Sequence, residues 1–225
     1  MIFNMNGPLN EWEANLSEAA LQTLAAIGVI FLTSLLLGIV LGLFLVTMRS
    51  GEGSGKKAVY HGVKVLLAVF YTIPFILLLL VILPGVQFIP TPFGWWEVNL
   101  LLILIFTSYI GRALESCYAA DNGITEAYEA LGVSKKDILL KVLWREKRPM
   151  IIRSVTTAAI AVTGAVVIAE IIGGGGLGGL SYHVGYAEEE LGLLYTIVSL
   201  LILLVLLLKV VGLGLAATGP GRRRR

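Results

Sequence analysis

The sequence predicts an all-α integral membrane protein with five transmembrane helices, and two observations carry that prediction. Hydrophobic residues make up 57% of the 225 residues and charged residues only 14%, which gives a mean hydropathy of +0.87. The apolar residues also gather in runs close to the roughly 20 residues that cross a hydrocarbon core of about 30 Å. A net charge of +2 and a single cysteine, Cys117, argue against a nucleic-acid binder and a disulfide-rich scaffold.

Five apolar runs define the predicted transmembrane helices. The second run contains Pro74, which a membrane helix tolerates as a kink because neighbouring groups can satisfy the freed carbonyl. The third begins with Trp95 and Trp96, an aromatic type that gathers at membrane interfaces. The predicted spans are residues 24–46, 65–83, 95–111, 154–172 and 191–208, within one transmembrane domain that covers residues 1–225.

The positions of the basic residues predict the orientation of these spans. Lys and Arg are retained on the cytoplasmic side of a membrane. Residues 1–23, 84–94 and 173–190 contain neither, so all 17 basic residues lie in the remaining segments, which include the run Arg222 to Arg225. We therefore predict that the N-terminus lies outside and the C-terminus in the cytoplasm.

Two predicted spans carry small residues one helical turn apart. Such residues let helix backbones approach closely, which is how helices pack when lipid removes the usual hydrophobic drive. In the fourth span the small residues fit packing within one subunit or a seam between two copies. The two sets are Ser34, Gly38 and Gly42 in the first span, and Ala161, Ala165 and Ala169 in the fourth.

Glu170 and the glycines after it form a candidate site at the outer end of the fourth span. An ionisable residue at membrane depth normally faces a bundle interior or a water-filled cavity, although Glu170 also fits a hydrated position at the interface. The glycine-rich segment 173–179 contains a GxGxxG pattern but lacks the strand and helix of a dinucleotide site, and no Gly-Lys-Ser/Thr follows it. We interpret it as a flexible outer loop beside Tyr182, His183 and Tyr186.

The inner loop at residues 112–149 is the longest connection and predicts two short helices. The first ends at Gly132, and Ser134 with Asp137 predicts a capping box that starts the second. The second has an apolar side and a basic side, and Pro149 is expected to end it. The residues alone fit an amphipathic hairpin that anchors the bundle at the interface, or a small knob for a cytosolic partner.

The inner loop resembles the EAA loop of permease subunits from bacterial ABC importers. The resemblance begins with the run EAYEALG at residues 126–132 and continues with the apolar segment 138–143, Glu146 and Pro149. More narrowly, the chain is similar to methionine-type permeases through residues 70–76 of the second span and through the glycines and tyrosines at 175–186. The resemblance covers about residues 21–208, and the chain departs from the family pattern at Tyr71, Arg145 and Glu170.

The resemblance implies a multi-pass protein of the bacterial cytoplasmic (inner) membrane that is not an enzyme. It implies a homodimer, two cytoplasmic ABC ATPase subunits that bind ATP and Mg, and an external substrate-binding protein. No catalytic residue, metal, cofactor or nucleic acid is expected for this chain itself. The implied coupling helix contains Glu126, Ala127, Glu129, Ala130, Leu131 and Gly132, and the candidate substrate pathway or gate contains Pro74, Glu170, Gly175, Gly176, Gly178, Tyr182 and Tyr186.

The resemblance favours methionine or another small amino acid as the transported molecule. An ABC permease for an osmoprotectant or a sulfonate is an alternative within the same family. An autonomous channel or proton-coupled carrier would use Glu170 as its membrane-embedded acid. A scaffold that recruits a partner through its inner loop without transporting anything is the other alternative.

Overall fold

The computed structural model describes residues 9–49, 53–74, 76–78, 96–119, 122–134, 137–173, 175–187 and 189–218. The regular structure in these ranges is helical throughout, which confirms the all-α prediction, and η denotes a π-helical segment. The elements are α1 (Leu9–Arg49), α2 (Ser54–Thr72), α4 (Trp96–Ala119), α5 (Asn122–Ala130), η1 (Ile138–Leu143), α7 (Trp144–Gly173), α8 (Gly176–Leu180), η2 (Ser181–Tyr186) and α9 (Leu191–Ala217).

Four described helices are long and apolar enough to cross a membrane. They correspond to the first, third, fourth and fifth predicted spans and are longer than predicted, at Leu16–Arg49, Val98–Ala119, Trp144–Ile172 and Leu191–Ala217. The second predicted span, residues 65–83, lies partly outside the described residues, so it stays a prediction. Helix α2 covers its beginning and ends at Thr72.

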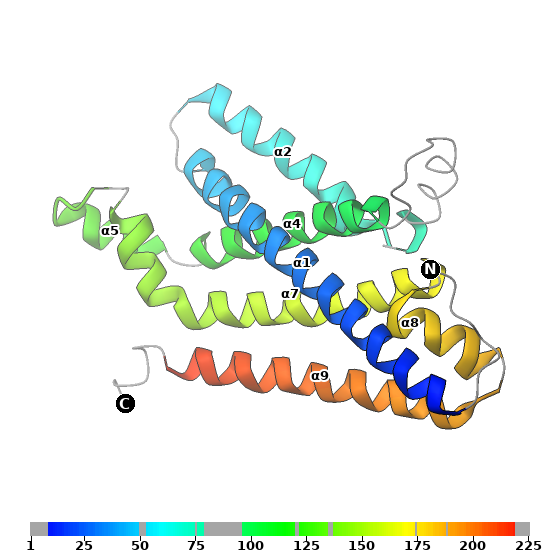
Figure 1. Ribbon diagram of the computed structural model, residues 1–225. Coiled ribbons are helices and arrows are strands. Elements are labelled where there is room, and N and C mark those ends of the chain that lie inside the picture. The colour runs from blue at the N-terminus through cyan, green and yellow to red at the C-terminus, as the bar shows by residue number, and fades with distance from the viewer. Residues whose placement is uncertain are drawn as a thin grey trace.

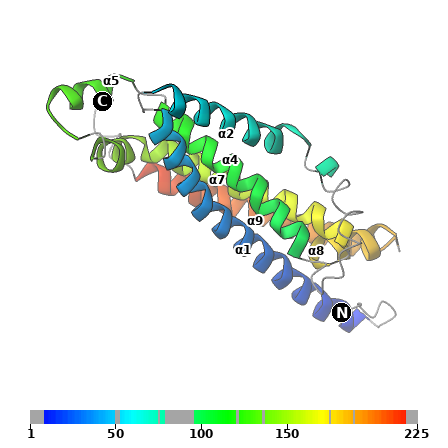
Figure 2. The same ribbon diagram turned by 90° about the horizontal axis from the view of Figure 1, so that it is seen from above.

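The long helices form an elongated bundle (Figures 1 and 2). Helix α1 packs along α4, α7 packs against both α4 and α9, and α2 folds back beside α1 and α4. Helix α5 projects at one end of the bundle, whereas α8 and η2 lie at the opposite end. Helix α1 begins beside α8, and α9 ends on the same side of the bundle as α5.

The main apolar core lies where α1, α4 and α7 meet. Ile30, Leu102 and Val162 are fully buried there. Ala165 and Ala169 belong to the same cluster. These two alanines of the predicted fourth span therefore serve packing within one subunit, whereas Ala161 is exposed.

Glycine brings α1 and α4 into close contact. A Cβ at Gly38 would lie 2.7 Å from a side-chain carbon of Ile110, and one at Gly42 would lie 2.8 Å from Cβ of Leu114. On the opposing helix, a Cβ at Gly111 would lie 2.8 Å from a methyl carbon of Leu41. These distances are shorter than ordinary van der Waals contacts, so the helices approach this closely because the side chains are absent.

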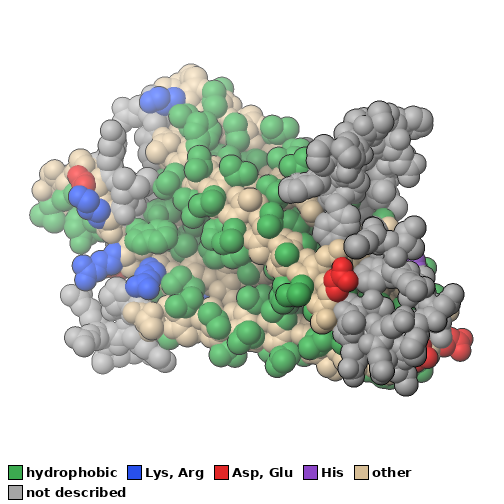
Figure 3. All heavy atoms as spheres, in the orientation of Figure 1, with side chains coloured by type: hydrophobic (Ala, Val, Ile, Leu, Met, Phe, Trp, Pro, Cys, Tyr) green, Lys and Arg blue, Asp and Glu red, His purple; other side chains and the backbone are tan. Residues whose placement is uncertain are grey.

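The face in Figure 3 is apolar around the middle of the bundle and charged toward its ends. Apolar side chains cover the centre of the face in view, with Lys and Arg gathered at the α5 end and most of the acidic side chains at the other. Helix α9 is mainly exposed along its apolar length, as at Leu203 and Leu207. Such a surface suits contact with lipid or with another membrane helix.

Pro149 does not end a helix, contrary to the prediction. Helix α7 begins at Trp144 and continues through Pro149 to Gly173. A proline inside a helix removes one N–H and leaves the carbonyl four residues earlier without its usual partner. Here that carbonyl belongs to Arg145, whose residue is exposed, so water can satisfy it and the helix continues.

Candidate functional site: a projecting inner helix and a capped outer helix

The six predicted coupling residues lie together on a projecting knob. Helix α5 stands apart from the bundle in both ribbon views (Figures 1 and 2). Leu131 directly after it is 76% exposed. The predicted residues Glu126, Ala127, Glu129, Ala130, Leu131 and Gly132 are all exposed. We call residues 122–132 the inner knob, after the predicted inner loop to which they belong.

Gly132 ends the inner knob with a tight reversal. Its φ angle of +77° lies in the left-handed region, which side chains other than that of glycine rarely adopt. The N–H of Val133 donates to the carbonyl of Tyr128 at 3.1 Å, and the N–H of Gly132 donates to that of Glu129 at 2.9 Å. This pair of bonds is a Schellman motif, so the glycine predicted from sequence to end the helix does so for a conformational reason.

A small polar cluster begins the next helix. The N–H of Asp137 donates to Oγ of Ser134 at 3.2 Å, and that hydroxyl donates to Oδ2 of Asp137 at 2.6 Å. Lys141 lies 2.7 Å from Oδ1 of Asp137. The hydrogen bond from Lys141, and then that from Ser134, lowers the pKa of Asp137 below its ordinary value of 3.8. Ser134 therefore makes its half of the predicted capping box directly before η1, and the Asp137 carboxylate accepts from the Ser134 hydroxyl.

Ile138 ties this part of the chain to the bundle. Its side chain is 1% exposed and packs in a cluster with Ile110, Leu114 and Cys117 of α4 and Ile151 of α7. The inner knob follows α4 in the chain, and η1 runs directly into α7. A displacement of the knob would therefore reach two long helices.

At the end of the bundle opposite α5, Glu170 holds the start of α8. Its residue is 4% exposed, so it is buried rather than hydrated at the interface. The hydroxyl of Thr23 lies 2.8 Å and 2.9 Å from its two carboxylate oxygens. The N–H of Gly178 donates to Oε2 at 3.0 Å. Glu170 thus joins α7 to α1 and to α8.

Two side chains of α1 complete this cap. The N–H of Leu177 donates to Oγ1 of Thr23 at 2.8 Å, and the N–H of Gly176 donates to Oε1 of Gln22 at 3.0 Å. The first amides of a helix lack partners within the helix, so side-chain acceptors stabilise its start. Every one of the first three amides of α8 has such an acceptor.

The prediction of a flexible outer loop at residues 173–179 is wrong for the described part of that segment. Gly176 to Leu180 form a short helix whose residues are all buried. Gly176 has a φ of +60°, and a Cβ there would overlap the carboxylate of Glu170. At Gly178 a Cβ would overlap the carbonyl oxygen of Val167. The glycines are needed for close approach to α7, not for mobility.

The remaining predicted pathway residues are divided. Gly175 is the buried cap residue before α8. Tyr182 and Tyr186 are exposed on η2, and their rings stack with centroids 6.0 Å apart. Pro74 is exposed beyond the end of α2. The structure therefore brings together Glu170, Gly176 and Gly178, with Gly175 next to them.

Three residues that make polar contacts across the bundle were not predicted as site residues from the sequence: Gln22, Thr23 and Glu115. Gln22 and Thr23 lie in an ordinary helical segment and carry no local signal. Glu115 is buried in α4, where the predicted third span had already ended. Its signal was present, because an acidic residue close to a long apolar run is a candidate for a polar network.

The described residues contain no group of three or more His, Cys, Asp or Glu side chains that could hold a metal ion. The two features of the site are structural: the inner knob at one end of the bundle is connected to two long helices, and at the other end the short helix α8 is capped by side chains of α1 and α7.

Comparison with known proteins identifies relatives along most of the chain. The profile of the family described as "Binding-protein-dependent transport system inner membrane component" matches residues 34–218. The chain is 29% identical over 159 residues to the methionine import system permease protein MetP of Bacillus subtilis, across 70% of this chain and 72% of that one. It is 26% identical over 199 residues to the probable D-methionine transport system permease protein MetI of Vibrio cholerae, across 88% of each.

The fold of the chain is also similar to that of a solved structure. The chain is similar to a chain of the MetNI methionine ABC transporter in an inward-facing conformation, with a TM-score of 0.80 and 26% identity. The similarity covers 92% of this chain and 96% of that chain.

Proposed function

The chain belongs to the family of binding-protein-dependent transport system inner membrane components, and from that premise we propose that it imports methionine as the permease subunit of an ABC transporter. The match over residues 34–218 carries this proposal. The relatives named above support methionine as the substrate, since they are methionine permeases. The chain is a multi-pass protein of the cytoplasmic membrane, and ATP hydrolysis belongs to a separate subunit.

We propose five spans, with the N-terminus outside and the C-terminus in the cytoplasm. Four of the spans are the apolar helices described above, and the fifth is the predicted span at residues 65–83. The gathering of Lys and Arg at the α5 end supports a cytoplasmic position for that end (Figure 3).

In this proposal the inner knob is the coupling helix. It docks in a groove of the ATPase, where ATP and Mg are bound, and the small side chains of Ala127 and Ala130 permit close contact. A second copy of the permease completes the pathway, and an external binding protein delivers the substrate. The exposure of residues 126–132 supports this role, because a partner can reach them without disturbing the bundle.

The cycle then requires two global states that ATP and substrate bias differently. Closure of the ATPases displaces the inner knob. Because Ile138 is packed between α4 and α7, the displacement tilts both helices and opens the pathway to one side and then the other. The permease makes and breaks no covalent bond.

Uptake by reconstituted vesicles tests the function. Vesicles with the permease, its cognate ATPase and its binding protein should accumulate labelled methionine only when ATP is supplied to the ATPase side. Excess glycine betaine or taurine should not compete. Competition by either would replace methionine with an osmoprotectant or a sulfonate, and uptake without ATP would favour an autonomous carrier.

A matched pair of glycine variants tests the coupling role. Gly132→Val places a β-branched residue at a positive φ and strains the knob by about 1–2 kcal/mol, so the ATPase should bind about tenfold more weakly. Gly123→Val is the control, because Gly123 is an exposed glycine of the same inner knob and a Cβ there meets nothing within 4 Å. Equal ATPase binding by both variants would assign the knob another role. A chain that binds the ATPase but supports no uptake of methionine would be a scaffold.

A further inference from the structure

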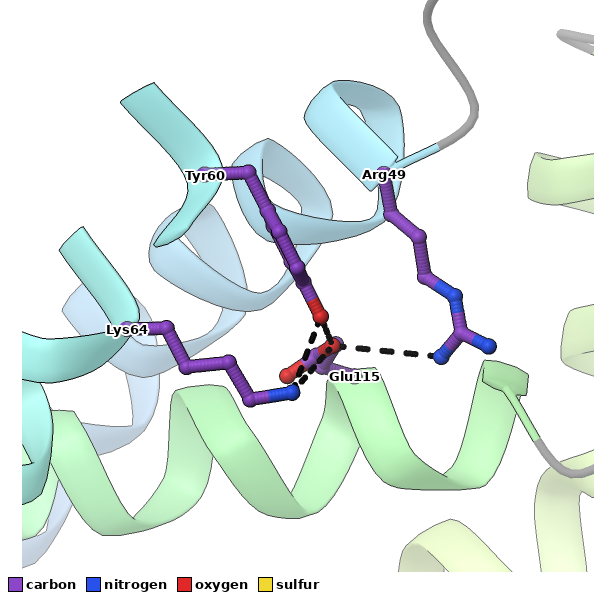
Figure 4. A network of polar contacts seen from close by, with 4 residues as sticks. All are labelled: Arg49, Tyr60, Lys64 and Glu115. Carbon is purple, nitrogen blue, oxygen red and sulfur yellow. Dashed lines mark hydrogen bonds and ion pairs between the residues drawn. The ribbon is translucent and has the colours of Figure 1, made fainter. Parts of the chain in front are cut away.

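Glu115 is a buried acidic residue of α4 that the transport cycle described above does not use. It is 3% exposed. Three side chains from two other helices converge on its carboxylate (Figure 4): Arg49 from the end of α1, and Tyr60 and Lys64 from α2. We call these four residues the Glu115 cluster.

The contacts of the cluster differ in kind. The hydroxyl of Tyr60, itself a buried residue, donates to Oε1 of Glu115. Nζ of Lys64 lies 3.6 Å from the same oxygen, and Nη1 of Arg49 lies 3.9 Å from it. Lys64 also donates to the hydroxyl of Tyr60 at 2.9 Å. That hydrogen bond, together with the charge of Glu115, raises the pKa of Lys64.

The two ion pairs by themselves stabilise the fold only weakly. Both cationic side chains are more than a third exposed, and ion pairs as exposed as these contribute little to stability. A buried carboxylate that loses its partners is strongly destabilised, because the desolvation penalty of the ion is then uncompensated. The cluster therefore resists separation of its members more than it stabilises the fold.

Helix α2 has few other attachments among the described residues. Its buried apolar contacts are a small cluster of Tyr60 and Leu67 with Leu45 of α1. On its other side Val65 and Leu66 are largely exposed. This apolar cluster joins α2 to α1, whereas the contacts of Tyr60 and Lys64 with Glu115 join α2 to α4.

We propose that Glu115 is a positioning residue that fastens the inner ends of α1, α2 and α4 into one unit, which moves as a whole when the inner knob is displaced. A state that separates α2 from α4 would strand the carboxylate away from Tyr60 and Lys64, so such a state is avoided. The fastening stands on the contacts of this chain alone, whereas its use in a cycle rests on the proposed function.

Distance measurements by electron paramagnetic resonance test the fastening. Spin labels replace the exposed residues Val59 of α2 and Leu104 of α4 in a Cys117→Ser background, within the assembled transporter in lipid. Labelled permease is diluted with an excess of unlabelled permease before assembly, so that most transporters carry both labels on one copy only. We expect one narrow distance distribution, the same without nucleotide and with ATP trapped. Tyr60→Phe and Lys64→Met should each broaden it, whereas Lys64→Arg should not. Lys56→Met is the matched control, since Lys56 is an exposed lysine of the same helix.

Two results would overturn the proposal. One is a wild-type distance that shifts between the two nucleotide states, and the other is a distribution that Tyr60→Phe and Lys64→Met leave as narrow as the control. The mild Tyr60→Phe change keeps the ring and the apolar packing, so it separates loss of the hydroxyl from loss of the fold.

A second readout links the cluster to transport. Methionine taken up per ATP hydrolysed should fall several-fold in Lys64→Met and recover in Lys64→Arg, and an unchanged ratio in Lys64→Met would remove Glu115 from the cycle. If the wild-type transporter takes up no methionine, the proposed function fails while the distance result still decides the fastening.

Discussion

The contact between α1 and α4 makes a quantitative prediction about Gly42. Replacing it with alanine adds a Cβ that would lie 2.8 Å from Cβ of Leu114 and 3.1 Å from the carbonyl oxygen of Gly111. Neither is the flexible tip of a side chain, so the helices themselves must separate slightly. Gly42→Ala should therefore destabilise the bundle although alanine is the better helix former.

The magnitude follows from two opposing effects. Replacing glycine with alanine inside a helix gains roughly 0.5–1 kcal/mol, and overpacking a well-packed seam costs about 1–3 kcal/mol. Gly28→Ala isolates the first effect, because Gly28 lies in the same helix and a Cβ there meets nothing within 4 Å. We expect Gly42→Ala to be about 1–3 kcal/mol less stable than Gly28→Ala.

Reversible unfolding of the detergent-solubilised chain by sodium dodecyl sulfate, followed by circular dichroism, gives the required free energies. A related pair adds a specific check. The Cβ of Gly111→Ala would press on the side-chain tip of Leu41, so Leu41→Ala should relieve part of its cost in a double-mutant cycle. Equal stability of Gly42→Ala and Gly28→Ala, with no coupling between positions 41 and 111, would refute the reasoning.

Two further predictions concern the ends of the bundle. Gly178→Ala should lower ATP-driven uptake several-fold in an otherwise folded protein, because its Cβ would push α8 away from Val167 and break the hydrogen bond to Glu170. Gly192→Ala is the control and should leave uptake unchanged, because a Cβ there meets open space. Directly before η1, the hydrogen bonds from Lys141 and Ser134 lower the pKa of Asp137. The ionised carboxylate therefore stabilises the start of η1 above the ordinary pKa of 3.8, and this contribution is lost as the pH falls through the lowered value. The Ile138 amide, which donates to the carbonyl of Ser134, reports on the start of η1. At neutral pH its hydrogen exchange should be faster in Asp137→Asn than in wild type. On acidification the start of η1 should open further in wild type but little in that variant. An Asp137→Asn protein that opens on acidification as strongly as wild type would assign the effect to another group.

Several features of the fold and of the site follow from short stretches of sequence. The apolar runs predicted the four described spans because any helix of that composition must be removed from water. Gly132 and the Ser134–Asp137 pair predicted the end of one helix and the start of the next, since each acts on backbone groups within a few residues. The spacing of Gly38 and Gly42 likewise predicted a face for close helix packing.

Other features depend on residues far apart in the chain. The acceptor for the Leu177 amide is Thr23, 154 residues away, so a glycine-rich stretch predicted as a loop became a buried helix. Tyr60 is 55 residues from Glu115, whose carboxylate it binds in the part of α4 that lies past the predicted end of the span. In an unfolded chain these polar groups would form hydrogen bonds with water, so their own sequence does not specify which partner they bind.

The sequence by itself thus determined which segments are apolar, where local caps start or end a helix, and, through family membership, what the protein does. Only the tertiary structure decided that Glu170 and Glu115 are buried, and which side chains they bind. The physical reason is that the cost of burying a charge depends on the partners that other helices bring to it, and those partners are set by packing rather than by neighbouring residues.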